Sequence, residues 1–309
     1  MILADATWQK WQAAIRARGF RAMAAAPAAR AQCGETVRQW LAQSHHADMA
    51  WFERNLDKRL DPRLVVEGAQ SVIMLTAAYW PKPVQLGPFK LARYAAGSDY
   101  HEILKDALMG FCTEHLQPLG ANYRVYVDTG PLLERYWAQQ AGLGWIGRSG
   151  NLISRKDGSY LFLAGIITDL KVPYGEPHRD FCGTCRACID ACPTEAITEQ
   201  RTVDSKRCIS YLTIEHRGPL PNLPFDNWLF GCDICQEVCP WPQKFATEPE
   251  RSEFEPRPVY AQLTEEQLAG ADAIQFAEWF RRSPIKRTKL AGFLRNIVHL
   301  KQKNPKLKA

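Results

Sequence analysis

The stretch Cys182-Gly-Thr-Cys185-Arg-Ala-Cys188-Ile-Asp-Ala-Cys192-Pro193 decides how this chain is organised. Its spacing, C-x2-C-x2-C-x3-C-P, lets a short loop offer three thiolates to one [4Fe–4S] cluster, while the fourth cysteine, before proline, binds a second cluster. A second run, Cys232-x2-Cys235-x3-Cys239-Pro240, lacks the first cysteine of this pattern, and Cys208 is the nearby cysteine that can take its place. With Cys208 included, the chain has the four thiolates that each of two clusters needs.

The spacing also assigns each cysteine to a cluster, because the last cysteine of each run crosses to the other cluster. The predicted ligands of cluster 1 are Cys182, Cys185, Cys188 and Cys239. The predicted ligands of cluster 2 are Cys192, Cys208, Cys232 and Cys235. Structural zinc is the alternative, since paired C-x2-C units also form all-cysteine zinc sites. A zinc site needs four ligands and does not require the uninterrupted C-x2-C-x2-C-x3-C-P spacing of the first run, so two iron–sulfur clusters are the favoured interpretation.

Size and cysteine usage indicate a folded protein of a reducing compartment. The 309 residues are 46% hydrophobic, which suffices for a sizeable core. Cys33 and Cys112 are left over and are predicted to be ordinary buried thiols, because a disulfide framework is unusual when cysteines are bunched at cluster spacing. No signal-peptide pattern is found, and the longest apolar run, Ser71 to Trp80, is far shorter than the ~20 residues of a membrane span. We expect a cytoplasmic protein without a membrane segment.

Positive charge is concentrated near the C-terminus. From Arg281 to Ala309 there are ten Lys or Arg and no Asp or Glu, so the rest of the chain carries 29 minus 33, or −4, of the total of +6. Such a segment is either a solubilising end or a surface that contacts phosphates, with a salt-dependent affinity.

Composition and hydrophobic periodicity divide the chain into three predicted parts: an α/β domain (1–175), a cluster domain (176–245) and a helical basic region (246–309). The elements expected in the first part are helices at 7–17 and 35–43, a buried central strand at 71–79, a helix capped by Ser98 or Asp99, a strand at 123–127, and a hairpin of strands 151–154 and 160–168. Those expected in the third part are helices at 264–268, 274–280 and 285–300.

Asp128 is placed by the signals around it. Pro131 suits the first position of a helix and Gly142 its end, so Asp128 is expected between the end of a strand and the start of a helix. In open α/β sheets ligands bind at this edge. The alternative role for such an Asp is helix capping.

Other cofactor motifs are missing from the sequence. No phosphate loop, no G-x-G-x-x-G after a strand, no G-x-S-x-G elbow and no H-E-x-x-H occur. Iron–sulfur is therefore the only prosthetic group that the residues themselves indicate. A two-cluster domain attached to an α/β domain predicts electron delivery to something bound there, because a bare electron carrier would not need that domain.

Several stretches together resemble the epoxyqueuosine reductase family, which acts in the last step of making the tRNA base queuosine. They are Arg93–His101, Tyr126–Arg135, Gly142–Gly147, Arg207–Pro219, Gly231–Trp241 and Ser283–Arg287. The resemblance implies an α/β (α+β) fold. A nitroreductase-like cobalamin-binding domain, similar to that of reductive dehalogenases, precedes a two-cluster [4Fe–4S] ferredoxin-like domain and a short helical basic C-terminus.

The same resemblance implies an activity and its partners. Epoxyqueuosine is reduced to queuosine in the anticodon stem-loop of tRNA, with electrons from a carrier such as ferredoxin or flavodoxin passing through two [4Fe–4S] clusters to cobalamin. The protein is expected to act as a monomer. Two alternatives remain open at this point: a reductive dehalogenase-like enzyme acting on a small molecule, which the basic C-terminus disfavours, and a ferredoxin-type electron carrier. Salt-sensitive tRNA binding distinguishes the first interpretation from both.

By its position in the D-T-G-P-L motif, Asp128 is implied to be the proton donor. The implied cobalamin contacts are Arg59, Ala95, Asp128, Leu152 and Leu163. A helix N-terminus would lower the pKa of Asp128 and burial against a corrin would raise it, and the sequence leaves open which effect is larger. The sequence departs from expected patterns at Asp99-Tyr-His101-Glu-Ile-Leu104, where the cobalamin signature D-x-H-x-x-G ends in Leu, and at Arg148, where the family usually has Lys.

Overall fold

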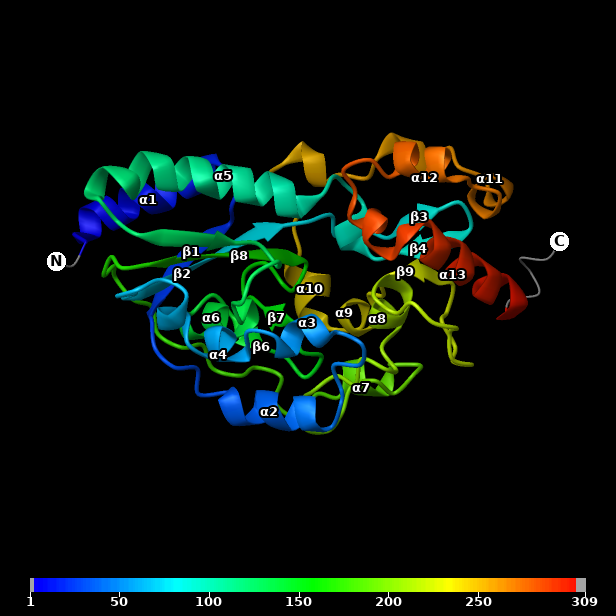
Figure 1. The fold of residues 1–309 in the computed structure, drawn as a ribbon, viewed down its shortest axis with the longest axis horizontal. Helices are drawn as coiled ribbons and strands as arrows, with labels where there is room; N and C mark the ends of the chain where they lie inside the picture. Colours follow the sequence, from blue (N-terminus) through cyan, green and yellow to red (C-terminus); the bar gives the residue numbers. More distant parts are fainter. Residues whose placement is uncertain (1–2, 304–309) are drawn as a thin grey trace.

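The fold is built on a four-stranded antiparallel sheet (Figure 1). The computed structural model describes residues 3–303. The strands lie in the order β1 (Ala22–Pro27), β2 (Ser71–Ala78), β8 (Leu161–Thr168) and β5 (Tyr123–Tyr126). In the central pair of strands, Met74 of β2 lies opposite Gly165 of β8. The predicted central strand is confirmed, since β2 is buried along its whole length.

Helices cover both faces of this sheet. Ile73 and Leu75 of β2 pack in a core with α1 (Asp5–Ala17) and α5 (Tyr100–His115), whereas Met74 packs on the opposite face with α6 (Glu134–Gln140). Successive side chains of a strand point to opposite faces, so a continuous apolar run is the pattern of a strand that is covered twice. The shorter helices on the α6 side are α2 (Gly34–Ala42), α3 (Ala50–Glu53) and α4 (Leu56–Leu60) (Figure 1).

The predicted helices of the first part are confirmed at α1, α2 and α5. Trp8, Trp11 and Ile15 form the buried stripe of α1. Asp99 caps α5, because its carboxylate accepts a hydrogen bond from the backbone N–H of His101 at 3.1 Å.

The predicted hairpin of residues 151–154 with 160–168 is wrong. β7 (Leu152–Ile153) pairs with β6 (Trp145–Ile146), and both edges of β8 are occupied by β2 and β5. The turn between Ser154 and Gly158 is closed by an isolated bridge and by the backbone N–H groups of Lys156 and Asp157, which donate to Oγ of Ser154. Apolar strand patterns do not specify which strands pair, so the partner of β7 could not be read from the sequence.

A second core joins segments that are far apart in the chain. β9 (Trp228–Phe230) pairs in parallel with β4 (Phe89–Leu91), and β4 pairs with β3 (Val84–Leu86). The helices α8 (Ile209–Ile214), α11 (Glu265–Ala269), α12 (Ala273–Trp279) and α13 (Lys289–Lys303) complete this core. All three predicted parts therefore contribute to one hydrophobic cluster, and their boundaries at residues 175 and 245 stay a prediction.

The basic C-terminal segment is partly structural. Its last helix, α13, begins at Lys289 rather than at the predicted Ile285, because Pro284–Thr288 forms a 3-10 turn. Asn296 is fully buried, and its Nδ2 donates to the backbone carbonyls of Thr213 and Leu229 at 2.9 and 3.0 Å. These bonds hold α13 against α8 and β9.

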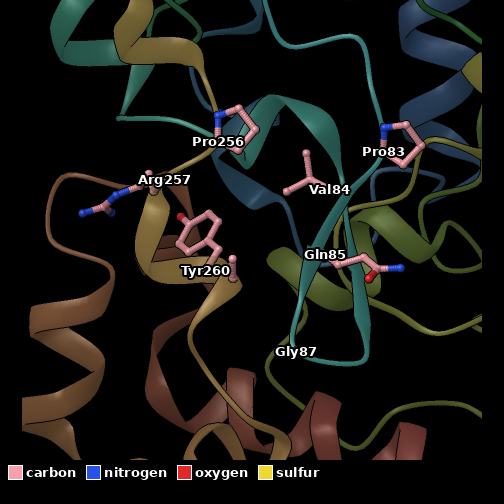
Figure 2. A pocket seen from close by; sticks show the side chains of 8 residues that line it. Pro83, Val84, Gln85, Gly87, Pro256, Arg257 and Tyr260 are labelled. Atoms are coloured by element: carbon pink, nitrogen blue, oxygen red, sulfur yellow. The ribbon is translucent and has the colours of Figure 1, made fainter.

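The second core also borders a cavity whose lining contains none of the predicted site residues. It has a volume of about 550 Å³, and Val84, Arg257 and Tyr260 are among its lining residues (Figure 2). No helix within residues 3–303 is long and apolar enough to cross a membrane.

Candidate functional site

Five of the predicted ligand cysteines line one small cavity. Its volume is about 70 Å³, and the cysteines in its wall are Cys182, Cys185, Cys188, Cys235 and Cys239. Four of these are the cysteines predicted for cluster 1, so the fold brings Cys239 of the second run to the first run. Zinc would hold its sulfurs about 2.3 Å from one point. Within residues 3–303 no three Cys, His, Asp or Glu side chains converge in that way, and the sulfurs instead surround a hollow.

The second cysteine run contributes Cys235 and Cys239 to the wall of this cavity, and all three of its cysteines are half-buried. Burial, followed by the charges of Cys208 and other neighbours that include Cys192, raises the pKa of the Cys235 thiol. Burial also raises the pKa of Cys232, and it raises that of Cys239 to about 11. Without iron, the thiols of Cys232, Cys235 and Cys239 are therefore protonated at neutral pH, and iron displaces their protons when it binds.

Short helices hold the two cysteine runs together. α7 (Ala187–Asp190) contains Cys188, and α9 (Ile234–Glu237) contains Cys235. The two helices pack against each other. α10 (Pro240–Phe245) starts directly after Cys239, with proline in its first turn.

Asp128 lies in a tight turn after β5 and has a left-handed backbone with φ 57°. The predicted helix start at Pro131 is wrong, because α6 begins at Glu134 with Leu133 as its N-cap. Asp128 is therefore not a helix cap. The sheet is antiparallel, so the rule for ligand sites at parallel sheet edges does not place Asp128 either.

Side chains from α5 and α6 hold Asp128 instead. Its carboxylate accepts a hydrogen bond from the Tyr100 hydroxyl at 2.7 Å and lies 3.5 Å from Nε2 of His101. The backbone N–H of Asp128 donates to Oε1 of Glu134 at 2.7 Å. The Asp128 side chain is still 59% exposed, so it is fixed by its neighbours and open to a ligand.

These neighbours decide which groups hold protons. Burial lowers the pKa of His101, but hydrogen bonds to Asp128 and Asp99 outweigh burial and raise this pKa to about 9. Burial, followed by the Asp128 charge, raises the pKa of Glu134 to about 8. Surrounding protein atoms partly desolvate Asp128 even though its side chain is 59% exposed, and this raises its pKa, but hydrogen bonds with His101 and Tyr100 outweigh the desolvation and lower the pKa. At neutral pH the site therefore holds protons on His101 and Glu134, next to a carboxylate.

Arg59 is a buried cation beside the same turn. It is 8% exposed, and its Nη1 donates to the backbone carbonyl of Gly130 at 3.0 Å. Its guanidinium lies 4.7 Å from the ring centroid of Phe52 and 5.4 Å from that of Trp51. Within residues 3–303 its buried Nε has no hydrogen-bond partner. An unmade hydrogen bond at a buried donor is costly, so this N–H fits a ligand that offers an acceptor.

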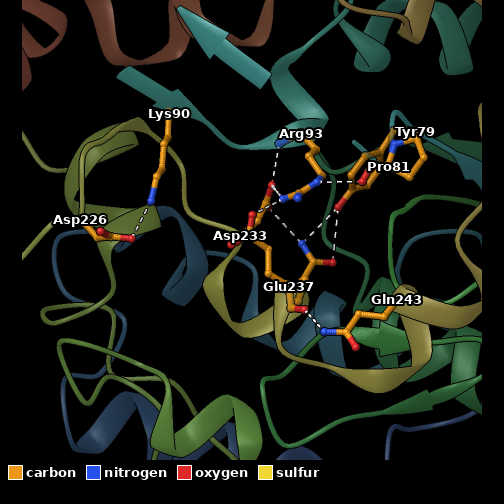
Figure 3. A network of polar contacts seen from close by, with 9 residues as sticks. Tyr79, Pro81, Lys90, Arg93, Asp226, Asp233, Glu237 and Gln243 are labelled. Atoms are coloured by element: carbon orange, nitrogen blue, oxygen red, sulfur yellow. Dashed lines mark hydrogen bonds and ion pairs between the residues drawn. The ribbon is translucent and has the colours of Figure 1, made fainter. Parts of the chain in front are cut away.

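A buried ion pair connects the second cysteine run to the chain segment before α5 (Figure 3). Arg93 starts the 3-10 turn η2 (Arg93–Ala95), and its backbone N–H and Nη1 donate to Oδ2 of Asp233 at 2.7 and 3.1 Å. Nη1 also donates to Glu237 at 2.7 Å. The Arg93 and Asp233 side chains are 6% and 2% exposed, so the cysteine run and η2 are held together by a desolvated charge pair.

Comparisons with known proteins agree with this geometry. The family described as "4Fe-4S double cluster binding domain" matches residues 181–242, and "Epoxyqueuosine reductase QueG, DUF1730" matches residues 59–129. The epoxyqueuosine reductases of Leadbetterella byssophila and Cellulophaga algicola are each 43% identical to this chain, over 86% of its length and 88% of theirs. The chain belongs to the epoxyqueuosine reductase family.

Solved structures of epoxyqueuosine reductases share the fold. One that contains a tRNA-Tyr epoxyqueuosine-modified stem loop matches with a TM-score of 0.85 and 25% identity, over 96% of this chain and 81% of that chain. The enzyme of Bacillus subtilis, with its catalytic loop swung out of the active site, matches with a TM-score of 0.84, 25% identity and coverage of 96% and 82%. The mixed α/β fold with a 4Fe–4S binding domain is confirmed.

Membership of the epoxyqueuosine reductase family makes the chain an oxidoreductase that converts epoxyqueuosine to queuosine in tRNA, with [4Fe–4S] clusters and cobalamin as cofactors. This confirms the main interpretation over the dehalogenase-like and electron-carrier alternatives. The residues present fit both kinds of cofactor. Cysteine sulfurs surround a hollow, and the buried Nε of Arg59 needs an acceptor near the open Asp128 carboxylate.

The other three predicted cobalamin contacts are not all brought together. Leu152 is buried in a hydrophobic cluster on the α6 side of the sheet, and the partly buried Leu163 packs against this cluster. Ala95 is fully buried in the second core, and its carbonyl accepts a hydrogen bond from Tyr260 at 3.4 Å. Their contact with cobalamin stays a prediction.

Sequence reasoning missed the roles of Tyr100, His101 and Glu134. The available signal was the capping Asp99, which fixes the first turn of α5 and thereby the direction of the two aromatic side chains that follow it. No spacing rule connects these residues to Asp128, because they meet only through the packing of α5 against the sheet.

Proposed function

We propose that this chain removes the epoxide oxygen of epoxyqueuosine in the anticodon loop of tRNA, with Asp128 protonating the departing oxygen. The observation that carries the proposal is the Asp128 carboxylate, which Tyr100 and His101 hold in place while it stays open to a ligand. Loss of the oxygen as water consumes two electrons and two protons, so the site has to join an electron supply to a proton supply.

The cysteines are proposed to supply the electrons. Cys185 is exposed, whereas the other predicted ligands are partly covered. Electrons from a carrier such as ferredoxin or flavodoxin would therefore enter through the cluster that Cys185 would help to hold. The proposed ligands of cluster 1 are Cys182, Cys185, Cys188 and Cys239, and those of cluster 2 are Cys192, Cys208, Cys232 and Cys235. The Arg93–Asp233 pair holds the second cysteine run against η2. The helix that follows η2 in the chain, α5, carries Tyr100 and His101 of the Asp128 site.

Cobalamin, when bound, would supply the reducing centre. We propose that Arg59, Ala95, Leu152 and Leu163 help to hold it. The orphaned Nε of Arg59 supports this role for Arg59.

His101 is proposed to store the proton that Asp128 delivers. With its pKa raised to about 9, His101 is protonated at neutral pH. Its Nε2 lies 3.5 Å from the Asp128 carboxylate, so the proton passes from His101 to Asp128 and on to the departing oxygen. When substrate and cofactor bind, they would shield the Asp128 carboxylate from water, which favours its neutral form. This favours transfer of the proton from His101 to Asp128.

The tRNA is proposed to contact the basic C-terminal surface, and the related enzyme solved with a tRNA stem loop supports this partner. Arg281, Lys286 and Lys289 are exposed. By contrast, Arg287 pairs with Glu215, and Arg295 donates to backbone carbonyls. The exposed cations are suited to phosphate contacts beside a single-stranded loop. We further propose that the protein acts as a monomer in the cytoplasm.

Anaerobic reconstitution of the wild type and the Asp128→Asn variant tests the proposal. Both are expected to hold about eight irons and to show corrin absorption. The variant is expected to convert epoxyqueuosine-containing tRNA at least ~100-fold more slowly, which is the usual contribution of a general acid. Asp226→Asn is a matched control, because Asp226 also has a left-handed backbone and an exposed side chain. Full activity of Asp128→Asn would exclude Asp128 as the donor, and a wild type that converts no tRNA would exclude the function.

A further inference from the structure

The β6–β7 hairpin lies between the two cysteine runs and has a fixed shape. Its turn is closed by Gly150, whose φ is 77°, and by a hydrogen bond from the Gly147 N–H to the Asn151 carbonyl at 2.9 Å. At the base of the hairpin, a Cβ on Gly144 would lie 2.3 Å from the carbonyl oxygen of Ile153. The two strands are therefore closer together than a side chain at residue 144 would permit.

The two sides of this hairpin each direct one N–H to a cysteine sulfur. Nε1 of Trp145 in β6 donates to Sγ of Cys182 at 3.4 Å. Nδ2 of Asn151, directly before β7, donates to Sγ of Cys235 at 3.7 Å. The first sulfur belongs to the proposed cluster 1 and the second to the proposed cluster 2. Within residues 3–303, these are the only side-chain N–H groups that donate to the proposed ligands.

The surroundings fix the direction of these donors. Trp145 is fully buried, and its ring lies 4.9 Å from that of Trp241 and 5.3 Å from that of Phe181. In the turn, Nη2 of Arg148 donates to the carbonyl of Gly183 at 2.9 Å, which attaches the hairpin to the first cysteine loop. Water cannot reach the buried Trp145 donor, and Nδ2 of the half-buried Asn151 also donates to Oγ of Ser149 at 3.4 Å, which helps to orient its amide.

Hydrogen bonds to the sulfurs are among the factors that set the reduction potential of an iron–sulfur cluster. Reduction adds negative charge to the cluster. An N–H aimed at a ligand sulfur stabilises the more negative state, so it raises the potential.

We propose that the β6–β7 hairpin sets the reduction potentials of both clusters, through Trp145 for cluster 1 and through Asn151 for cluster 2. The inference rests on the proposed assignment of the cysteines to the two clusters. Because one rigid element carries both donors, it fixes the two potentials relative to each other. Trp145 and Asn151 are positioning residues for electron transfer, since neither touches the substrate.

Redox titration of the anaerobic holoenzyme, followed by electron paramagnetic resonance, tests this inference. Trp145→Phe keeps an aromatic ring and removes the N–H, and Asn151→Leu keeps a similar volume and removes the other N–H. The first variant is expected to shift the midpoint potential of cluster 1 to a more negative value and to leave cluster 2 unchanged. The second is expected to do the reverse, so each variant is a control for the other.

Trp241→Phe is a further control, because the Trp241 ring packs against Trp145 and, within residues 3–303, its side chain donates no hydrogen bond to a proposed ligand. The backbone hydrogen bond from Trp241 to Cys239 is unchanged in this variant. No shift is expected for it. Unchanged midpoint potentials of both clusters in Trp145→Phe and Asn151→Leu, at about eight irons per chain, would overturn this inference. The proposed function would not be affected by that result. A shift as large in Trp241→Phe would also overturn it. If Trp145→Phe loses iron, the titration of Asn151→Leu decides. A wild type without two clusters would overturn the ligand assignment and the proposed electron path.

Discussion

The cluster segment and the Asp128 site encode their chemistry in different ways. Within each cysteine run two or three residues separate consecutive ligands, so the local chain brings most of the sulfurs together. Around Asp128, the interacting groups come from α5, from the turn after β5 and from α6, and they meet only in the folded protein. The comparison shows that metal ligands can be fixed by spacing, whereas the proton content of a site is fixed by distances and burial.

Cys208 gives the sharpest test of the comparison, because it is the proposed ligand that lies outside both short runs. Cys208→Ser is expected to lose cluster 2, to lower the iron content from about eight to about four, and to abolish conversion of epoxyqueuosine-containing tRNA. Iron analysis and electron paramagnetic resonance of the anaerobic protein measure this. Cys33→Ser, outside the cysteine runs, is the control and should keep all the iron. An unchanged iron content in Cys208→Ser would show that another group completes the second cluster.

Substitution of Arg93 tests whether the buried charge pair in Figure 3 holds the second cysteine run against η2. Arg93→Gln leaves the Asp233 carboxylate buried without its cation, and removing one partner of a buried pair costs about 3 to 5 kcal/mol. The free energy of unfolding should fall by this amount and lower the urea midpoint of the anaerobic holoenzyme.

Arg282→Gln is the matched control for Arg93→Gln. Its ion pair with Glu102 is exposed, so the loss should be no more than about 1 kcal/mol. Equal losses in the two variants would mean that the Arg93–Asp233 pair does not join the regions.

The pH dependence of turnover probes the proton store at the Asp128 site. His101 keeps its proton until the pH rises through about 9, so the turnover rate of the wild type should fall above that pH by about tenfold per pH unit. In Asp99→Asn, the fall should begin at a lower pH, because the variant keeps a good helix cap and removes a charge that raises the pKa of His101.

The same shift affects stability. Because the pKa of His101 is raised from 6.5 to about 9 in the folded protein, the contribution of its protonated form to stability is complete below pH 6.5 and is lost as the pH rises through about 9.

The outcome that would contradict the turnover prediction is a pH profile of turnover in Asp99→Asn that superimposes on that of the wild type. It would assign the fall in turnover to a group other than His101.

The smallest expected effect concerns the basic surface. Lys286→Ala removes one exposed cation, so the slope of the logarithm of the tRNA binding constant against the logarithm of the salt concentration should decrease in magnitude by about 1. Lys10→Ala on α1, far from α13 in Figure 1, is the control and should leave the slope unchanged. Equal slopes for the wild type and Lys286→Ala would place the tRNA elsewhere.

The sequence by itself was sufficient to predict the cysteine ligands of two iron–sulfur clusters, the buried central strand β2 and the capping of α5 by Asp99. Each of these depends on residues that are neighbours in the chain, so periodicity and spacing are sufficient to predict it. The family resemblance added the activity and cobalamin.

Only the tertiary structure decided the pairing of β7 with β6, the start of α6 at Glu134 and the parallel pairing of β4 with β9. It also decided that Asp128 is held by Tyr100 and His101 rather than placed at a helix end. The physical reason is common to all of them. Strand partners, hydrogen bonds and pKa shifts depend on groups that approach each other through space, and the sequence pattern around one residue carries no record of those distances.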